Sequence, residues 1–166
     1  MAKITALIYV HAAQVQRLGR TLDSLRPCDQ VLVINQDSNK EVESIGESHG
    51  AEVLAGIPGV SLGAYLVNAR HDWLLAVSPC EELSQELQHA IEQWKQEGDH
   101  EDVVGFSVPI SQQSENRWRS GPPETRLVNR NKVNWTGELP TASLKAPLLN
   151  GNLLRFQNHH QSQKNP

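Results

Sequence analysis

The sequence predicts an α/β protein with a mostly parallel sheet, helices on both faces of the sheet and an antiparallel hairpin at its edge. Up to residue 110, short apolar runs alternate with segments whose apolar residues recur at helical spacing. Such alternation is typical of strand–helix–strand units, which build parallel sheets. Residues 73–77 are apolar throughout, as expected of an interior strand that is covered on both faces.

The expected elements follow one another regularly along the chain. Residues 4–10 are rich in β-branched side chains and are expected to form the first strand. Residues 14–25 place Leu18 and Leu22 on one apolar face of a helix. The other expected strands are residues 31–34, 51–54, 73–77 and 103–110, and the other expected helices are residues 41–49, residues 61–69 and a segment marked by Leu83, Leu87, Ile91 and Trp94 that ends at Gly98.

The pattern changes after residue 110. Residues 111–123 are polar and rich in turn formers, whereas residues 126–128 and 132–135 are expected to pair as the antiparallel hairpin. We expect residues 1–156 to form a single domain. Residues 157–166, which include His159 and His160, have almost no apolar side chain and are expected to be a disordered polar tail.

The composition excludes several classes of protein. The 166 residues carry a formal net charge of -4 and are 38% hydrophobic, which suits one globular domain. The sequence contains no run of basic residues that would indicate a nucleic-acid partner, and it contains no apolar run long enough for a membrane span. Cys28 and Cys80 lie far apart and are expected to be free thiols. The N-terminus has no signal-peptide cleavage site, so we expect a cytoplasmic protein.

The loop at residues 78–81 follows the central strand, at the kind of strand end where open α/β sheets bind ligands. The segment resembles the corresponding strand and loop of family 2 glycosyltransferases with the GT-A fold, of the kind that builds lipopolysaccharide core. Those proteins carry an aspartate–any–aspartate motif behind a Trp-rich strand, often with a glutamate directly after it. Here Ser78 and Cys80 stand at the aspartate positions, and only Glu81 matches. A hydroxyl and a thiol are poor ligands for magnesium or manganese, so we expect no metal and no cofactor.

The resemblance extends over residues 4–140 and implies further site positions, most of which depart from the family pattern. By position, the nucleotide would lie against His11, Asn35, Asp37 and Ser38. An Arg-Asn pair of the family is replaced here by Leu62 and Gly63, and a His-Glu pair by Pro140 and Thr141. The stretch from Arg126 to Arg130 and the Trp135-Thr136-Gly137 run keep a likeness to the family's Arg-Leu-Phe-Arg and Trp-x-Gly motifs.

Transfer from a nucleotide-diphosphate sugar needs a cation at the leaving diphosphate, and this loop lacks the carboxylates that would hold a metal ion. Three functional hypotheses are therefore considered. The first is a glycosyltransferase-like domain without metal-dependent sugar transfer, acting as a binding or partner module. The second is a working transferase with a metal-independent site, in which Lys40 or Arg70 neutralises the diphosphate. The third is an α/β module that binds an unrelated small molecule. We expect a nucleotide or nucleotide-sugar to bind weakly at best, because Glu81 would repel phosphate.

Two side chains have an alternative chemical interpretation. Cys80 ahead of a helix could be a reactive thiolate, although a half-buried filler is the simpler reading. His11 could be a general base, although no partner for such a role is identifiable in the sequence. Among the tryptophans, Trp73 and Trp94 are expected in the core, whereas Trp118 and Trp135 could line a sugar-sized groove.

Overall fold

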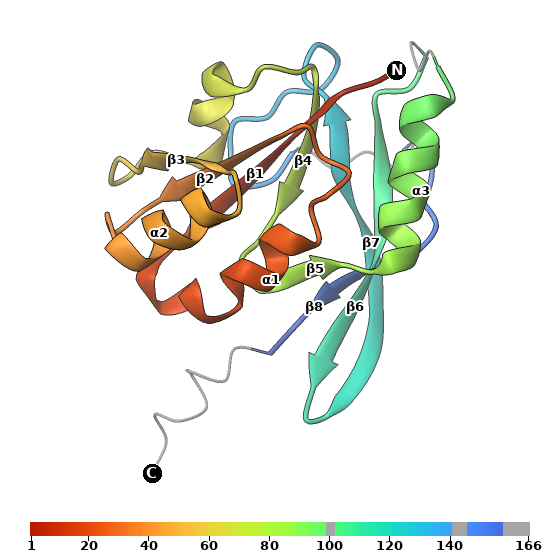
Figure 1. Cartoon of the computed structure of the whole chain (residues 1–166). Coiled ribbons are helices and arrows are strands. Elements are labelled where there is room, and N and C mark those ends of the chain that lie inside the picture. Colours follow the sequence, from red (N-terminus) through yellow and green to blue (C-terminus); the bar gives the residue numbers. More distant parts are fainter. Residues whose placement is uncertain (99–101, 141–145, 158–166) are drawn as a thin grey trace.

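The computed structural model describes residues 1–98, 102–140 and 146–157 (Figure 1). In this part of the chain, a single sheet of eight strands has the order β3-β2-β1-β4-β7-β6-β8-β5. The first four strands in that order are parallel: β1 (Ile4–Val10), β2 (Gln30–Asn35), β3 (Glu52–Ala55) and β4 (Trp73–Val77). The predicted fold class, an α/β protein whose parallel sheet has an antiparallel part, is confirmed.

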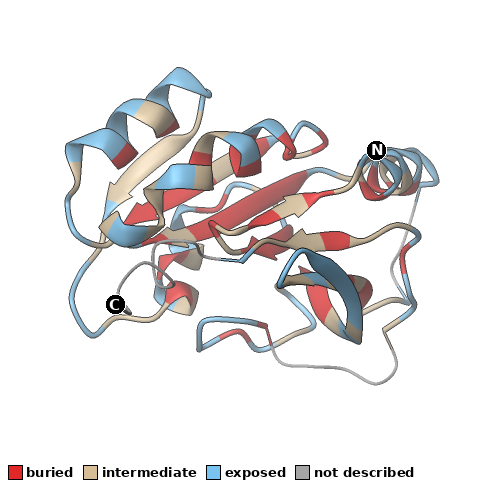
Figure 2. Cartoon of the chain, turned by 90° about the horizontal axis from the view of Figure 1, so that it is seen from below, coloured by how far each residue is buried: buried red, intermediate tan, exposed pale blue. Residues whose placement is uncertain are grey.

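Helices cover both faces of the sheet, as predicted. One face packs against α1 (Leu18–Asp23), α2 (Lys40–Ser48) and α3 (Gln85–Gln96), and the other against the 3-10 helix η2 (Leu62–Asn68). Successive residues of β1 alternate between the two hydrophobic cores, because side chains along a strand point to opposite faces. Figure 2 shows the buried residues concentrated on the central strands and on the inward sides of the helices.

Two predicted helices differ in type from the expectation. The segment expected to be one helix over residues 14–25 consists of a 3-10 helix, η1 (Ala12–Arg17), followed by α1. The segment at residues 61–69 forms the 3-10 helix η2 instead of an α-helix. Short helices of this kind are stabilised mainly by packing their apolar face on the sheet, so the apolar pattern located them without fixing their geometry.

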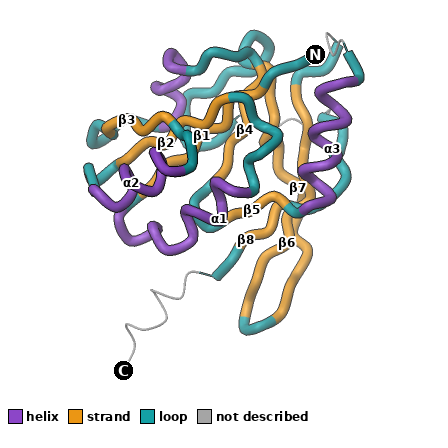
Figure 3. The backbone as a smooth tube through the Cα atoms, viewed as in Figure 1, coloured by secondary structure: helices purple, strands orange, loops and turns teal. Residues whose placement is uncertain are grey.

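The antiparallel hairpin is formed by other residues than those predicted. It joins β6 (Gly105–Ser114) to β7 (Arg117–Asn129), so the polar segment at residues 111–123 is strand and turn, while residues 132–135 are not a strand. Glu115 and Asn116 form its turn with φ values of 49° and 66°, the left-handed conformation that a tight hairpin turn requires. The end of this hairpin extends beyond the rest of the sheet (Figure 3).

The hairpin also lies inside the sheet and not at its edge. β7 pairs antiparallel with β4, β6 pairs parallel with β8 (Leu153–Arg155), and β8 pairs antiparallel with β5 (Glu81–Leu83). The short strand β5 occupies the start of the segment that was expected to lead directly into a helix. Ser84 then caps α3 by accepting a hydrogen bond from the Leu87 N–H at 3.2 Å.

Some predictions fall outside the described residues, namely those on Thr141 and on His159 and His160 in the expected tail. None of the described helices is long and apolar enough to cross a membrane. The expected core positions of Trp73 and Trp94 are confirmed, since their side chains are buried and pack edge to face with ring centroids 4.8 Å apart.

Candidate functional site

A cavity of about 630 Å³ lies at the carboxyl ends of β1 and β4, the edge where open α/β sheets bind ligands. Tyr9 and His11 reach it from β1 and the residue after it, and Ser78 from the end of β4. The charged residues of its wall come from several distant segments of the chain. They are Glu81 of β5, Glu124 and Arg126 of β7, Glu138, and Arg155 of β8.

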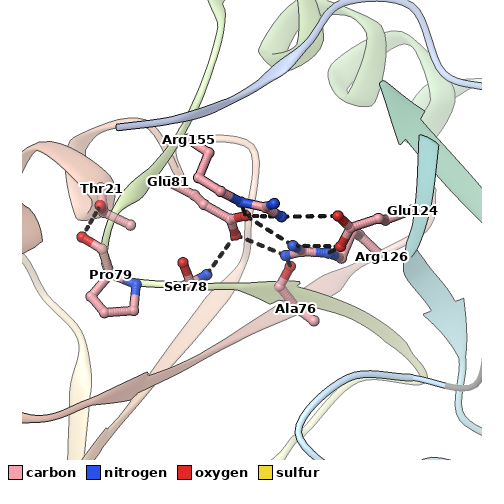
Figure 4. Close-up of polar contacts among 8 residues, drawn as sticks. All are labelled: Thr21, Ala76, Ser78, Pro79, Glu81, Glu124, Arg126 and Arg155. Atoms are coloured by element: carbon pink, nitrogen blue, oxygen red, sulfur yellow. Dashed lines mark hydrogen bonds and ion pairs between the residues drawn. The ribbon is translucent and has the colours of Figure 1, made fainter. Parts of the chain in front are cut away.

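Glu81 and Arg126 form a buried bidentate ion pair in the wall of this cavity (Figure 4). Arg126 Nη1 donates to Glu81 Oε1 at 2.8 Å, and Nη2 donates to Oε2 at 2.9 Å. The Glu81 side chain is 1% exposed and the Arg126 side chain 2% exposed, so both charges are withdrawn from water. The N–H of Ser78 donates to Glu81 Oε1 at 2.8 Å, which ties the loop to the carboxylate.

All the hydrogen-bond donors of Arg126 are occupied. Besides Glu81, Nη1 donates to the carbonyl oxygen of Ala76 at 3.0 Å, while Nε and Nη2 donate to Glu124 Oε1 at 3.2 and 3.0 Å. A guanidinium has five N–H donors, and these five contacts use each of them. Arg126 therefore has no donor left for a ligand unless one of these bonds breaks.

Arg155 completes the network from the C-terminal strand. Its Nε donates to Glu81 Oε2 at 3.1 Å and its Nη2 donates to Glu124 Oε2 at 2.9 Å. Burial lowers the pKa of Arg155, but hydrogen bonds and charge attraction from Glu124 and Glu81 raise that pKa above its ordinary value overall. For Glu124, burial raises the pKa, but Arg155 and Arg126 bring it below the ordinary value. The charges of the network therefore balance, with two guanidinium groups and two carboxylates.

This balance corrects the expectation that Glu81 would repel phosphate as an uncompensated charge. Its carboxylate faces two guanidinium groups, and each of its oxygens already accepts hydrogen bonds. The two guanidinium partners of Glu81 come from residues 45 and 74 positions away in the sequence, so no local pattern indicated them.

The residues at this loop do not fit a divalent cation. Such a cation prefers several unencumbered oxygen ligands, mostly carboxylates. Ser78 offers a hydroxyl and Cys80 a thiol, and the oxygens of Glu81 are engaged by Arg126 and Arg155. Across the described residues, no group of three or more His, Cys, Asp or Glu side chains is arranged to hold a metal ion.

Cys80 lies apart from the cavity lining. It lines a smaller cavity of about 280 Å³ beside Arg17 and Arg20, and its carbonyl oxygen accepts a hydrogen bond from the Phe156 N–H at 2.8 Å. Burial and the neighbouring Glu81 raise the pKa of the Cys80 thiol, although Arg17 opposes the shift. A raised pKa disfavours the thiolate, so the side chain suits a filler and not a nucleophile.

Of the positions expected to meet a nucleotide, the structure brings His11 and Asp37 together. His11 Nδ1 lies 3.8 Å from Asp37 Oδ2, and both side chains are about half exposed. Asn35 is buried, and its amide exchanges hydrogen bonds with the backbone of Asn39 at 2.9 and 3.0 Å, so it holds the turn before α2. Ser38 is exposed in that same turn.

The cations proposed to neutralise a diphosphate are not at the cavity. Arg70 pairs with Glu52 at 2.8 Å and lies at the opposite, amino-terminal end of the strands. Lys40 is exposed at the first residue of α2 and is not among the described residues that line the cavity. The cationic residues that do line the cavity, Arg126 and Arg155, were not recognised from the sequence as site residues.

Signals for two of the missed residues were available in the sequence. Arg126 opens the stretch that resembles the family's Arg-Leu-Phe-Arg motif. Glu124 and Arg126 are two positions apart in a strand, so their side chains share a face. No comparable signal pointed to Arg155. The tryptophans expected to line a groove do not line this cavity: Trp135 is buried and donates to the Gly137 carbonyl at 3.0 Å, and Trp118 is on the hairpin, packed against Phe156.

Comparison with known proteins relates the chain to glycosyltransferases. No protein-family model matches it. It is 34% identical over 95 residues to an uncharacterized glycosyltransferase of Rickettsia bellii, and 33% identical over 97 residues to one of Rickettsia felis. These matches cover 54% and 55% of this chain but 32% and 34% of the relatives. The chain thus spans about a third of the length of the curated relatives it matches.

Solved structures resemble the fold at low sequence identity. A mycobacterial protein has a TM-score of 0.58 at 13% identity, with 93% of this chain and 65% of that chain covered. Residues 1–349 of TarS from S. aureus give 0.52 at 13% identity, with 72% and 38% covered. Glucosyl-3-phosphoglycerate synthase of Mycobacterium tuberculosis, in complex with Mn²⁺, uridine diphosphate and phosphoglyceric acid, gives 0.50 at 12% identity, with 69% and 44% covered. The chain is a glycosyltransferase-like domain with a GT-A-like fold.

Proposed function

We propose that this glycosyltransferase-like domain, residues 1–156, does not catalyse metal-dependent sugar transfer and acts as a binding module for a small ligand in the cavity. The observation that carries the proposal is the state of Glu81. It is the only acid left at the motif that resembles the metal-binding loop, and it is buried in ion pairs with Arg126 and Arg155. A leaving diphosphate needs a cation beside it, and this loop supplies neither a metal site nor an uncompensated positive charge.

The ligand we propose is a nucleoside-like molecule that binds weakly. Tyr9 and His11 line the cavity near the end of β1 and retain hydrogen-bonding capacity, with Asp37 beside His11. Leu62 and Leu139 give the cavity apolar walls. A diphosphate placed farther in would face a network whose charges already balance, so its desolvation would not be offset. We expect the diphosphate and the sugar to add nothing to the affinity of the nucleoside.

Ligand-observed NMR with uridine, uridine diphosphate and a uridine-diphosphate sugar, with and without MnCl₂, tests this proposal. The expected result is weak binding of all three, with no tightening along the series and no effect of manganese. His11→Ala should weaken uridine binding, and His89→Ala on the exposed side of α3 is the matched control that should not. Clear tightening along the series would show that the cavity recognises a sugar donor and would overturn the proposal.

A second candidate function is metal-independent transfer, because the cavity is open and an exposed carboxylate, Glu138, lines it close to Tyr9. Such a carboxylate could act as a general base on an acceptor hydroxyl. The two functions differ in one measurement, the hydrolysis or transfer of a labelled diphosphate sugar in the presence of EDTA. Turnover that is lost in Glu138→Gln would support the transferase, and no turnover would support the binding module.

A further inference from the structure

Building on the proposed function, we infer that Arg126 takes the role of the divalent cation that the resembled aspartate motif would hold. Its guanidinium is a fixed positive charge that binds the carboxylates of Glu81 and Glu124 and holds the loop at residues 78–81 in position. Arg126 is then a positioning residue and not a contact for the ligand. Three features of the structure support this role.

The first feature is that two carboxylates converge on one cationic atom. Arg126 Nη2 lies 2.9 Å from Glu81 Oε2 and 3.0 Å from Glu124 Oε1. The two oxygens are therefore no more than about 6 Å apart, although Glu81 belongs to β5 and Glu124 to β7. Convergence of carboxylate oxygens from separate segments on one centre is how proteins surround a hard cation.

The second feature is what the guanidinium holds. Nη1 of Arg126 joins the Ala76 carbonyl oxygen near the end of β4 to Glu81 Oε1, and the same oxygen accepts the Ser78 N–H. This chain of contacts fixes both ends of the loop that follows β4. The loop is thus held in position by protein groups alone, without a requirement for metal.

The third feature is that the site excludes a competing cation. A divalent ion entering beside Glu81 would meet the positive charges of Arg126 and Arg155, and each carboxylate oxygen would first have to give up a charge-assisted hydrogen bond. Removal of Arg126 reverses this situation. Glu81 and Glu124 would then share only Arg155, and an uncompensated negative charge would be left in a buried site, where it favours binding of a cation.

The test measures Mn²⁺ binding to protein stripped with EDTA, by calorimetric titration and by the electron paramagnetic resonance of free Mn²⁺, together with the Tm in the presence and absence of MnCl₂. We expect that the unmodified protein does not bind Mn²⁺ at this site and has the same Tm with and without it. Arg126→Met should have a lower Tm, should bind Mn²⁺, and should regain part of the lost Tm when Mn²⁺ is added. Adding Glu81→Gln to Arg126→Met should largely abolish that binding, because the substitution removes a carboxylate that would be a ligand of the ion.

Arg155→Met is the matched control, because it leaves the network with the same excess negative charge but keeps Arg126, whose donors still engage Glu81 and Glu124. The Arg155 side chain is 31% exposed, so this variant should fold, and it should bind no Mn²⁺. The inference is overturned if the unmodified protein binds Mn²⁺ through Glu81, or if Arg126→Met folds and gains no binding. If Arg126→Met does not fold, Mn²⁺ binding by Arg155→Met through Glu81 would equally overturn it, and absence of binding would support it. None of these measurements uses a nucleotide or a sugar, so failure of the proposed function would be seen separately.

Discussion

Replacing Gly151 with alanine should destabilise the protein by about 2–4 kcal/mol, through two separable effects. Gly151 has a φ of 96°, which costs a residue with a Cβ atom about 1 kcal/mol or more. A Cβ built there would also lie 2.3 Å from the backbone nitrogen of Leu87 and 2.6 Å from its Cα, whereas ordinary contacts begin at 3.4 Å. The neighbouring atoms belong to the first turn of α3, so the loop or the helix must move by about 1 Å, and overpacking of this kind costs about 1–3 kcal/mol.

This glycine also bears on the candidate site. The adjacent Asn152 exchanges hydrogen bonds with Ser84, the N-cap of α3, at 3.0 and 3.1 Å, and the chain then runs directly into β8 and Arg155. Displacement of the loop is therefore expected to shift Arg155 away from Glu81 and Glu124. The free-energy cost should include part of that ion-pair network.

Gly50 provides the matched control. It has a φ of 75°, and a Cβ there would meet nothing within 4 Å, so Gly50→Ala carries the conformational cost without the steric clash. We expect Gly50→Ala to cost about 1 kcal/mol. Urea unfolding followed by tryptophan fluorescence and circular dichroism measures both free energies of unfolding. If Gly151→Ala costs no more than Gly50→Ala, the close approach of the loop to α3 is not as described.

Three further predictions follow from burial and charge. The pKa of Glu124 is lower in the folded protein than its ordinary value of 4.5. The stability that this carboxylate contributes is therefore present above pH 4.5 and is lost as the pH falls through the folded pKa. Urea titrations between pH 3 and 7 should show this loss in the unmodified protein and not in Glu124→Gln. Burial raises the pKa of Cys28 to about 12, from an ordinary value of 9.0, so at pH 8 the native protein should hold about a thousandfold less thiolate at this residue than an ordinary cysteine. Cys28 should therefore react quickly with a disulfide reagent only after unfolding. A rapid reaction of the native protein that is absent in Cys28→Ser would contradict this. Ile91→Ala in the core should lower the free energy of unfolding by about 2–5 kcal/mol. Val67→Ala, at a position that is 86% exposed, should change it by less than about 0.5 kcal/mol. Equal losses of the two variants in urea unfolding would refute the burial of Ile91 and the exposure of Val67.

Local sequence pattern was sufficient for the parallel part of the sheet. The apolar run at residues 73–77 predicted an interior strand, and every residue of β4 is buried. The helical spacing of Leu87, Ile91 and Trp94 likewise predicted the side chains of α3 that are buried. These predictions succeed because burial acts on each segment through its own periodicity, whatever its neighbours are.

The pattern failed where pairing between distant segments decides the structure. Residues 111–123 are polar and contain prolines, yet they belong to strands because the turn at Glu115 and Asn116 pairs them along the hairpin. The position of that hairpin inside the sheet depends on β8, which adds to β6 from the far end of the chain. Neither relation leaves a mark in the composition of the segments involved.

The sequence by itself determined what the loop at residues 78–81 lacks, since the identity of Ser78 and Cys80 settles that no carboxylate pair stands there. The sequence could not determine which charged groups surround Glu81, the one acidic residue of the motif that is present. From the sequence Glu81 is an isolated negative charge, whereas in the tertiary structure two guanidinium groups lie within hydrogen-bonding distance of it. The energy of a charge depends on its neighbours within a few ångströms, and at a sheet those neighbours arrive from strands 45 and 74 residues away.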